Sequence, residues 1–411
     1  MRVSSLLLAA LSLASSACAT ILQNGQVRDV SFPDTAIALD NAGNATWRTY
    51  PPNATEIGYK GRWDSKHISS LTSRSAPGLK FGFTGDRIAI TFGEHTSPGV
   101  LIGYRLDGQD WQFTNVTANS THALVTSATP GFNLTSSTSR TFELRVTNWS
   151  YGVQIAAVHT SAAGALLALP RAGRTLEIIG DSLSAGQYAT YEGLASYAWG
   201  LGEGLGGTEF SITAYPGICL VDADCWGNPR GQAHQWHYAS DTSWRAQQLY
   251  GDAPEEWDFA AHPAADVVVV NLGTNDNNTA NNVSASAYLQ TYVDFVADVH
   301  AVWPSAQIVL VSLWNGFSPV GSSYAQGGAF VDEIQEVART YAGDGFVHYF
   351  NTTGIMQHND IGPQWHPTDV GHLKLASHLM QFIKIKFGWD LLATGPEVQH
   401  ETLYWNDQAN Y

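Results

Sequence analysis

The segment from Leu176 to Tyr188 constrains the fold more than any other, because its character changes within a few residues. Apolar residues lead from Leu176 into Gly180-Asp181-Ser182, as at the end of a buried strand, and a helix-like segment begins near Tyr188. A serine at such a strand-to-helix turn exposes its hydroxyl beside backbone N–H groups, which suits a nucleophile. Alone, the tripeptide is also typical of a turn or a helix N-cap.

Two later motifs add to the significance of this serine. The run Asn271–Asp276 closes a second apolar strand, and Trp365-His366-Pro367 lies near the C-terminus. Serine, glycine, asparagine and histidine therefore occur in the order that names the SGNH, or GDSL-type, hydrolases, and the chain resembles this family over residues 174–390. The resemblance implies hydrolysis of an acyl ester, a reaction that needs no cofactor.

Composition divides the chain near residue 165. Before this point, short alternating runs such as Arg87–Phe92 and Thr141–Val146 are separated by Gly, Asn, Pro and Ser. The run Leu101–Leu106 precedes Asp107-Gly108, which is a hairpin signal. Many short strands without helical periodicity predict a β-sandwich of jelly-roll type.

From Leu176 onward the pattern changes to buried apolar strands that alternate with longer helical segments. Strands are expected at residues 267–272, 308–312 and 346–350, and helices near 285–302, 329–342 and 371–387. Strand–helix alternation predicts an α/β fold, here an SGNH three-layer α/β/α domain with a parallel sheet. In such sheets the catalytic residues lie at the carboxyl ends of the strands.

The predicted organisation has four parts: a signal peptide over residues 1–19, the β-sandwich over 20–165, the SGNH hydrolase domain over 166–395 and a tail over 396–411. Arg2, a short apolar core and the A-x-A site at Ala17-Cys18-Ala19 indicate the signal peptide. We therefore expect a secreted, extracellular protein. No later segment approaches the roughly 20 apolar residues of a transmembrane helix. The apolar connector at 162–170 should pack the two domains together.

Secretion bears on the cysteines and on the asparagines. Cleavage after Ala19 leaves Cys219 and Cys225, and a disulfide between them is favoured over two free thiols in an oxidising compartment. N-x-S/T sequons mark candidate glycosylation sites at Asn44, Asn53, Asn115, Asn119, Asn133, Asn148, Asn277, Asn282 and Asn351.

Charge narrows the range of partners. The chain carries 36 acidic and 20 basic residues, and this excess of negative charge argues against nucleic acid or an anionic membrane surface as partner. Its 14 Trp and 17 Tyr supply flat amphipathic rings of the kind that stack on sugars, although packing uses such rings equally well. The default expectation is a monomer that acts on carbohydrate.

A β-sandwich fused before an SGNH domain resembles the arrangement of carbohydrate esterase family 2, and the resemblance extends over nearly the whole mature chain. It includes the approach to the serine from Leu169-Pro170-Arg171 through Ile178-Ile179-Gly180. This resemblance implies removal of acetyl groups from plant-wall polysaccharides such as xylan or glucomannan, often at a sugar 6-hydroxyl. The expected substrate is therefore an acetylated polysaccharide or oligosaccharide, and the architecture does not fix which sugar.

Ester hydrolysis needs a nucleophile, a base and donors for the oxyanion. Ser182 is the predicted nucleophile and His366 the predicted base, since SGNH enzymes place their histidine before a proline. The resemblance assigns the oxyanion hole to the backbone N–H groups of Ser182 and Gly217 and to the side-chain amide of Asn275. The alternatives are an N-cap role for Ser182 and ordinary turns at the other two positions. Two neighbouring groups are interpreted as structural, namely Asp276 and His372.

The chain departs from most SGNH hydrolases at position 363. The family usually has an aspartate three residues before the histidine, which orients the imidazole, whereas this chain has Pro363. Family 2 esterases commonly lack this aspartate as well. We expect a backbone carbonyl between Pro363 and Trp365 to accept the ring N–H of His366, with Asp360 as the alternative, so that catalysis uses a Ser–His dyad. Asp369 is expected at the start of the last helix.

The substrate side is predicted from tryptophans near the motifs. Trp226, just after the cysteine loop, and Trp314, after a predicted strand, are the candidates for stacking on sugar, with core or lid packing as the alternative. His234 and His237 lack a clear third ligand, so no metal site is predicted. Two competing interpretations are a lipase or broad carboxylesterase on the same fold, and a carbohydrate-binding protein that has lost catalysis.

Overall fold

The computed structural model describes residues 21–23, 26–28, 31–39, 47–66, 71–72, 74–129, 132, 139–149 and 151–392. The predicted signal peptide, the sequons at Asn44 and Asn133 and the predicted C-terminal tail lie outside these residues. The chain divides into two compact units, Met1–Ser31 and Phe32–Tyr411. The first contains the antiparallel pair β1 (Ile21–Gln23) and β2 (Gln26–Arg28). All the elements described below belong to the second unit, and the predicted division near residue 165 stays a prediction.

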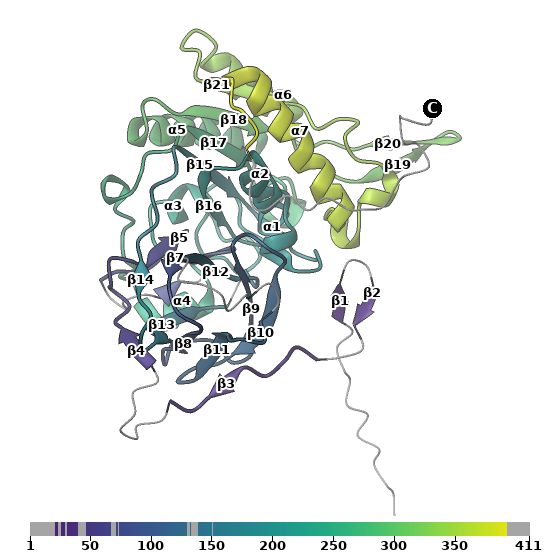
Figure 1. Ribbon diagram of the computed structural model, residues 1–411. Coiled ribbons are helices and arrows are strands. Elements are labelled where there is room, and N and C mark those ends of the chain that lie inside the picture. Colours follow the sequence, from purple (N-terminus) through teal and green to yellow (C-terminus); the bar gives the residue numbers. More distant parts are fainter. Residues whose placement is uncertain are drawn as a thin grey trace, which may run out of the picture. The chain divides into compact units, whose positions relative to one another are not determined.

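Two antiparallel sheets form the β-rich part of the second unit (Figure 1). Their strands are β3 (Ala36–Ile37), β4 (Trp47–Tyr50), β5 (Gly58–Lys60), β6 (Leu71–Thr72), β7 (Gly78–Phe83), β8 (Ile88–Phe92), β9 (Val100–Leu106), β10 (Gln112–Val116), β11 (Thr121–Val125), β12 (Arg140–Val146), β13 (Val153–Ser161) and β14 (Leu166–Leu167). One sheet has the order β10-β9-β12-β7-β14, with β5 beside β7. The other has the order β3-β11-β8-β13-β4, with β6 beside β13.

Alternation of apolar residues explains how these sheets pack. Along β8, Ile88, Ile90 and Phe92 are buried in a single apolar core to which both sheets contribute, because every second residue of a strand points the same way. Two sheets that bury their facing side chains in this way form a β-sandwich. The predicted hairpin is also present: Asp107 and Gly108 have φ of +50° and +71°, and β9 pairs with β10.

Five parallel strands form the sheet of the α/β part, in the order β16-β15-β17-β18-β21. The strands are β15 (Arg174–Gly180), β16 (Thr208–Ala214), β17 (Val267–Asn271), β18 (Gln307–Val311) and β21 (Val347–Phe350). The covering helices are α2 (Tyr197–Leu205) and α7 (Asp369–Phe387) on one face, and α5 (Ala285–Val302) and α6 (Val331–Thr340) on the other (Figure 1). The predicted three-layer α/β/α fold with a preceding β-sandwich is confirmed.

The apolar character of whole strands explains why both faces of this sheet are covered. In β17, Val267 and Val269 belong to the core shared with α2 and α7, whereas Val268 and Val270 belong to the core shared with α5 and α6. A strand buried on both faces needs apolar residues at every position. The chain reverses its direction of travel across the sheet between β15 and β17, and ligands of open α/β sheets bind at the carboxyl ends of strands at such a switch point.

Short elements connect the main ones. They are α1 (Ser182–Ala185), η1 (Glu192–Ala195), α3 (Gln232–Gln235), α4 (Trp244–Tyr250), η2 (Phe259–Ala261), η3 (Thr279–Asn281), η4 (His358–Asp360) and η5 (Pro363–Trp365). A hairpin of β19 (Phe317–Val320) and β20 (Ser323–Gln326) lies between β18 and α6, and the sequence pattern did not predict it. Among the described helices, none combines the length and the apolar character that crossing a membrane requires.

Ion pairs connect the sandwich to the α/β part within the second unit. Lys60 of β5 pairs with Glu209 of β16 at 2.5 Å. Arg105 of β9 pairs with Glu203 of α2 at 2.7 Å. Within the connector, Leu166 is buried in the core of the sandwich and pairs with β7 as part of β14. The expectation that the connector packs the two domains together stays a prediction.

Candidate active site

Ser182 lies where β15 ends and α1 begins, and it is only 4 % exposed. Asp181 is the N-cap of this helix, because its Oδ1 accepts a hydrogen bond of 2.9 Å from the N–H of Leu183. Gly180 permits the turn, since a Cβ there would overlap Oγ of Ser184. The alternative that Ser182 is the N-cap is therefore wrong, and the hydroxyl of Ser182 is not needed to cap the helix.

The turn after β16 lies beside this serine turn. The N–H of Tyr215 donates to the carbonyl of Gly180 at 3.4 Å, and Gly217 follows with a φ of +79°. A Cβ at Gly217 would lie 3.1 Å from Cβ of Trp226 and 3.2 Å from Nδ2 of Asn228. Glycine is needed here both for the left-handed backbone and for the close approach of the neighbouring loop.

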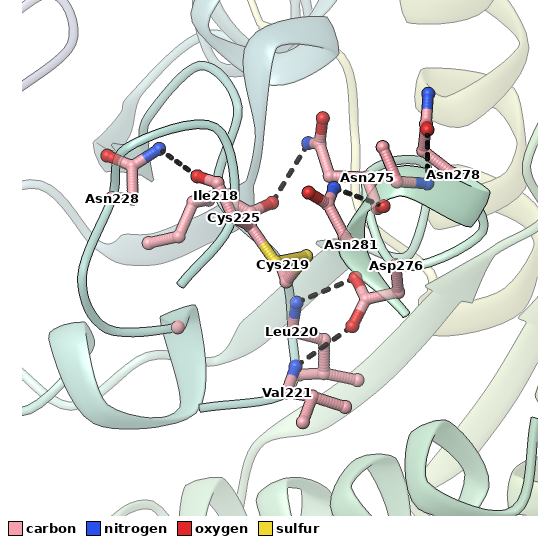
Figure 2. Close-up of a disulfide and its surroundings, with 12 residues drawn as sticks. Ile218, Cys219, Leu220, Val221, Cys225, Asn228, Asn275, Asp276, Asn278 and Asn281 are labelled. Carbon is pink, nitrogen blue, oxygen red and sulfur yellow. Dashed lines mark hydrogen bonds between the residues drawn. A yellow bond between two sulfur atoms is a disulfide. The ribbon is translucent and has the colours of Figure 1, made fainter. Parts of the chain in front are cut away.

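Figure 2 shows the loop that follows this turn. Cys219 and Cys225 form the predicted disulfide, with their Cα atoms 5.9 Å apart. Asp276 anchors the loop, because its carboxylate accepts hydrogen bonds from the N–H groups of Leu220 at 2.8 Å and Val221 at 3.0 Å. Burial raises the pKa of Asp276 to about 6, although these two bonds act in the opposite direction. The structural interpretation of Asp276 agrees with these contacts.

Asn275 connects the exit of β17 to the same loop. Its Nδ2 donates to the carbonyl of Ile218 at 2.9 Å, and its own backbone carbonyl accepts from Nδ2 of Asn281 at 2.9 Å (Figure 2). A side-chain amide carries two N–H donors, so one remains for a ligand. The structure thus brings two predicted oxyanion groups, the N–H of Gly217 and the amide of Asn275, onto one hydrogen-bonded loop.

His366 ends a short loop that precedes α7. Its Nδ1 lies 2.9 Å from the carbonyl oxygen of Gln364, within the stretch expected to supply the acceptor. A carbonyl can only accept, so Nδ1 carries the ring proton and Nε2 keeps its lone pair. Nε2 is buried and has no hydrogen-bond partner among the described residues. The imidazole is therefore held in the form that can act as a base.

The two acids near this loop are engaged elsewhere. Asp360 pairs with Nζ of Lys374 at 2.5 Å. Since Nδ1 of His366 bonds to the carbonyl of Gln364, the alternative that Asp360 orients His366 is contradicted. Asp369 is the first residue of α7, as expected, and it accepts a hydrogen bond of 2.9 Å from the N–H of Thr190. This bond connects the start of α7, just after the histidine loop, to the segment that follows Ser182.

The surroundings of His366 set its basicity. Burial lowers the pKa of His366, while its hydrogen bonds with the backbone at 363–364 raise it. The ring of Tyr188 stands edge-on to the imidazole, with ring centroids 4.9 Å apart. His372 is buried, its Nδ1 accepts from the N–H of Tyr197 at 3.0 Å, and burial lowers its pKa to about 3. A neutral structural histidine is therefore the correct description of His372.

Three exposed aromatic side chains lie next to these groups, and we call Tyr188, Trp226 and Trp365 the rim aromatics. They are 45 %, 58 % and 57 % exposed, and their φ angles are +71°, +54° and +66°. Such strained backbone conformations gather at functional sites. Trp226 was predicted as a sugar-stacking residue, whereas Tyr188 and Trp365 were missed, although both lie inside the serine and histidine motifs.

Trp314 does not belong to this rim. It is completely buried, in the core that the sheet shares with α2 and α7. The expectation that Trp314 stacks on a sugar is therefore wrong, and the packing alternative is correct. The sequence could not decide between the two, because Trp314 follows a strand that is apolar on both faces.

The predicted glycosylation sites within the described residues differ in accessibility. Asn148 is half-buried and its Oδ1 accepts a hydrogen bond of 3.0 Å from the N–H of Leu101, so it is the least suited to carry a glycan. The other described sequon asparagines are exposed, namely Asn53, Asn115, Asn119, Asn277, Asn282 and Asn351. Glycosylation at these positions stays a prediction.

Neither the histidine pair nor a cavity at the other edge of the sheet adds to the site. The rings of His234 and His237 pack against Tyr238 and Trp236, with centroids 4.7 and 5.1 Å apart. Within the described part of the chain, no group of three or more His, Cys, Asp or Glu could hold a metal ion. A cavity of about 310 Å³ lies at the amino ends of β15 and β16, on the opposite edge of the sheet from Ser182.

Sequence comparison relates the α/β part to known proteins. Residues 178–374 match the sequence profile of the GDSL-like Lipase/Acylhydrolase family. The chain is also 29 % identical over 136 residues to the cellulase/esterase CelE of Acetivibrio thermocellus, a match that covers 32 % of this chain. The chain thus spans only 16 % of the length of that relative.

Structural comparison extends over both parts. A family two carbohydrate esterase from Clostridium thermocellum, solved in complex with cellohexaose, is 23 % identical, with a TM-score of 0.65 over 81 % of this chain and 99 % of that one. An acetyl xylan esterase from Butyrivibrio proteoclasticus is 18 % identical, with a TM-score of 0.64 over 83 % of this chain and 100 % of that one. Residues 178–374 are therefore similar to the GDSL-like Lipase/Acylhydrolase family, and the chain shares the fold of the family two carbohydrate esterases.

Proposed function

We propose that this protein is a secreted carbohydrate O-acetyl esterase in which Ser182 and His366 act as a catalytic dyad. The observation that carries the proposal is the hydrogen bond of 2.9 Å between Nδ1 of His366 and the carbonyl oxygen of Gln364. It fixes the tautomer in which Nε2 can take a proton, which is the orienting role that an aspartate has in a conventional triad. The dyad therefore needs no acid at Pro363.

The first half of the reaction forms an acetyl-enzyme. Nε2 of His366 removes the hydroxyl proton of Ser182, and Oγ attacks the acetyl carbonyl carbon. Ser182 opens α1, so its N–H has no acceptor within the helix and is free to donate. This N–H, the N–H of Gly217 and the second amide N–H of Asn275 stabilise the oxyanion. His366 then protonates the sugar oxygen, which leaves as an alcohol.

The second half releases acetate. His366 removes a proton from a water molecule, the water attacks the acetyl group on Ser182, and the hydroxyl of Ser182 is restored. Whenever His366 is protonated, its imidazolium faces the dipole of a carbonyl, whereas a triad would offer a full negative charge. The stabilisation of the imidazolium is smaller as a result, and we propose that it suffices for an acetyl ester.

A carbohydrate substrate is supported by the rim aromatics, whose exposed rings present apolar faces of the kind that stack on sugars. The Clostridium thermocellum relative is complexed with cellohexaose, and the Butyrivibrio proteoclasticus relative is an acetyl xylan esterase. We therefore propose acetylated xylan or glucomannan as the substrate, with the sugar 6-hydroxyl as one candidate position. The predicted signal peptide supports secretion, and we expect the enzyme to act as a monomer.

The test is acetate release by the purified mature protein from acetylated xylan and acetylated glucomannan. p-Nitrophenyl acetate and a long-chain p-nitrophenyl ester are assayed in parallel. We expect acetate from at least one polysaccharide and little hydrolysis of the long-chain ester. Ser182→Ala should lower kcat by on the order of 10⁴-fold or more, because it removes the nucleophile, and it should leave the unfolding temperature unchanged.

The matched control is Ser184→Ala, which removes the other serine hydroxyl of α1. That hydroxyl bonds to the hydroxyl of Tyr197 at 2.6 Å in the interior, so the variant should keep most of the activity. Substantial activity in Ser182→Ala would contradict the assignment of the nucleophile. Activity confined to the long-chain ester would indicate a lipase, and binding of polysaccharide without hydrolysis of any ester would indicate a carbohydrate-binding protein.

A further inference from the structure

Gln364 and Trp365 adopt an unusual backbone conformation beside the histidine. Their φ angles are +49° and +66°, so two consecutive residues with side chains lie in the left-handed region. Residues other than glycine populate this region sparsely, and such a conformation persists only where the surrounding structure holds it. The carbonyl of Gln364 faces Nδ1 of His366, so the orientation of the imidazole depends on this turn.

Main-chain hydrogen bonds close the turn at its base. The N–H of His366 donates to the carbonyl of Pro363 at 3.0 Å, and the N–H of Gly362 donates to the carbonyl of His366 at 2.7 Å. Neither bond involves Gln364 or the exposed side chain of Trp365. The carbonyl of Gln364 bonds to the imidazole itself, so a contact from outside the turn would act through the side chain of Trp365.

Gly316 provides that contact. It is buried, has a φ of +80°, and lies against the indole of Trp365. A Cβ at Gly316 would overlap Cε3 of the indole and lie 2.7 Å from Cζ3 and 3.1 Å from Cδ2. The backbone of Gly316 is itself fixed, because its carbonyl accepts from the N–H of Gly327 at 2.9 Å and the N–H of Asn315 donates to the carbonyl of Gly327 at 3.1 Å.

We propose that Gly316 is a positioning residue for the general base. By leaving space for the indole of Trp365, it maintains the left-handed turn that directs the carbonyl of Gln364 at Nδ1 of His366. The inference rests on the proposed function, and it goes beyond it by assigning a role to a residue on a different connection of the sheet, after β18.

The arrangement matters because the acceptor of the His366 ring proton is a main-chain atom. A carboxylate could follow the imidazole by rotating its side chain, whereas a carbonyl moves only when the backbone of the turn moves. Among the described residues, two other titratable groups interact with the imidazole: Tyr188, with ring centroids 4.9 Å apart, and His372, through its electrostatic interaction. The nearby carboxylates of Asp360 and Asp369 are engaged in the bonds described above.

Gly316→Ala tests the proposal, with Gly321→Ala as the matched control. Gly321 lies in the turn between β19 and β20 and has a φ of +61°, but a Cβ there would meet no atom within 4 Å. Both variants therefore place alanine in the left-handed region, and only Gly316→Ala collides with the indole of Trp365. The difference between the two variants isolates the collision from the backbone strain.

p-Nitrophenyl acetate is the substrate, because its hydrolysis does not require sugar contacts. Relative to Gly321→Ala, Gly316→Ala should lower kcat by roughly 10- to 100-fold and change KM by less than about twofold. The acid limb of kcat/KM should move to lower pH, because the bond to Gln364 raises the pKa of His366 and would be weakened. NMR titration of the His366 ring should show the same shift independently of activity.

A double-mutant cycle with Trp365→Ala separates positioning from local damage. Without the indole there is nothing for the new methyl group to strike, so adding Gly316→Ala should cost no more than adding Gly321→Ala. Trp365→Ala alone releases the turn and should also lower the pKa of His366 in the NMR titration. This single variant keeps the proposal testable if Gly316→Ala does not fold.

Three results would overturn the proposal: equal kcat values for Gly316→Ala and Gly321→Ala, an unchanged NMR titration of His366 in Gly316→Ala and Trp365→Ala, or additive effects in the cycle. Failure of the proposed function has a different signature. If the wild type hydrolysed no ester while Gly316→Ala still shifted the titration of His366, the esterase assignment would fall and the positioning role would stand.

Discussion

For individual residues, burial decides how the site responds to pH, and His366 shows this most directly. In the proposed dyad the imidazole must be neutral to accept the proton of Ser182, and burial places its pKa below the ordinary histidine value. As pH falls, activity is lost only when His366 becomes protonated, so the acid limb of kcat/KM should lie below about pH 6.5. We expect more than half of the plateau value at that pH in a pH–rate profile with p-nitrophenyl acetate. An acid limb centred at higher pH would show that another group controls activity.

Asp181 is a second residue whose charge is disfavoured by burial. Its Oδ1 caps α1, but Oδ2 is buried and has no hydrogen-bond partner among the described residues. Burial, with a smaller contribution from the carboxylate of Asp276, raises the pKa of Asp181 to about 7 from an ordinary value of 3.8. Between these two values the folded protein binds more protons than the unfolded chain, so the stability that Asp181 contributes falls as pH rises.

Asp181→Asn keeps the capping oxygen and removes the ionisable group, so it should flatten this pH dependence. We expect its free energy of unfolding to exceed that of the wild type by up to on the order of 4 kcal/mol at pH 8, and by little at pH 4. Urea unfolding at the two pH values measures the difference. Asp276 contributes a dependence of the same sign, so some slope should remain. Identical slopes in the two proteins would contradict the elevated pKa.

Among the secondary-structure elements, the carboxyl ends of β15, β16 and β17 contribute the proposed oxyanion donors from three separate turns. Asn275→Ala removes the donor after β17 together with its bond to the carbonyl of Ile218. The loss of one oxyanion donor typically lowers kcat by on the order of 10²–10³-fold with little change in KM. Asn281→Ala is the control, because it removes only a bond to the backbone carbonyl of Asn275 and should cost much less. Equal losses in the two variants would indicate that the loop, and not the amide, matters.

The elements that could be predicted are those whose signal is local. Val267–Asn271 and Ala285–Val302 lie within a residue of the predicted strand and helix, because an apolar run and a helical period are written in consecutive residues. The serine and histidine motifs located Ser182 and His366 for the same reason. The burial of Trp314 and the left-handed backbone of Trp365 could not be predicted, since both arise from contacts with residues distant in the sequence.

Across the whole molecule, the sandwich contributes buried arginines to the α/β part. Arg62 and Arg74 are almost completely buried, and Arg62 pairs with Glu177 of β15 at 3.2 Å. Arg74 donates to three main-chain carbonyls at the end of α3 and just beyond, those of Gln235 at 3.0 Å, Tyr238 at 2.6 Å and Ala239 at 3.0 Å. These carbonyls belong to the connection between Gly217 and β17 that also carries the disulfide. The sandwich therefore supports a segment that forms part of the candidate active site.

Arg74→Met measures how much this support contributes. Burial lowers the pKa of Arg74 to about 9, so the guanidinium still carries its charge at neutral pH. Its buried N–H groups donate to the three carbonyls. The variant leaves those carbonyls buried without their donor, which should cost on the order of 3–5 kcal/mol of unfolding free energy and lower Tm by roughly 5–15 °C. Arg171→Met, at an exposed arginine just after the connector, should change Tm very little.

If Arg74→Met unfolded at the temperature of Arg171→Met, the sandwich would be dispensable to the fold of the active-site connection. If instead Tm and kcat fell together, the two parts of the chain would be one folding and functional unit.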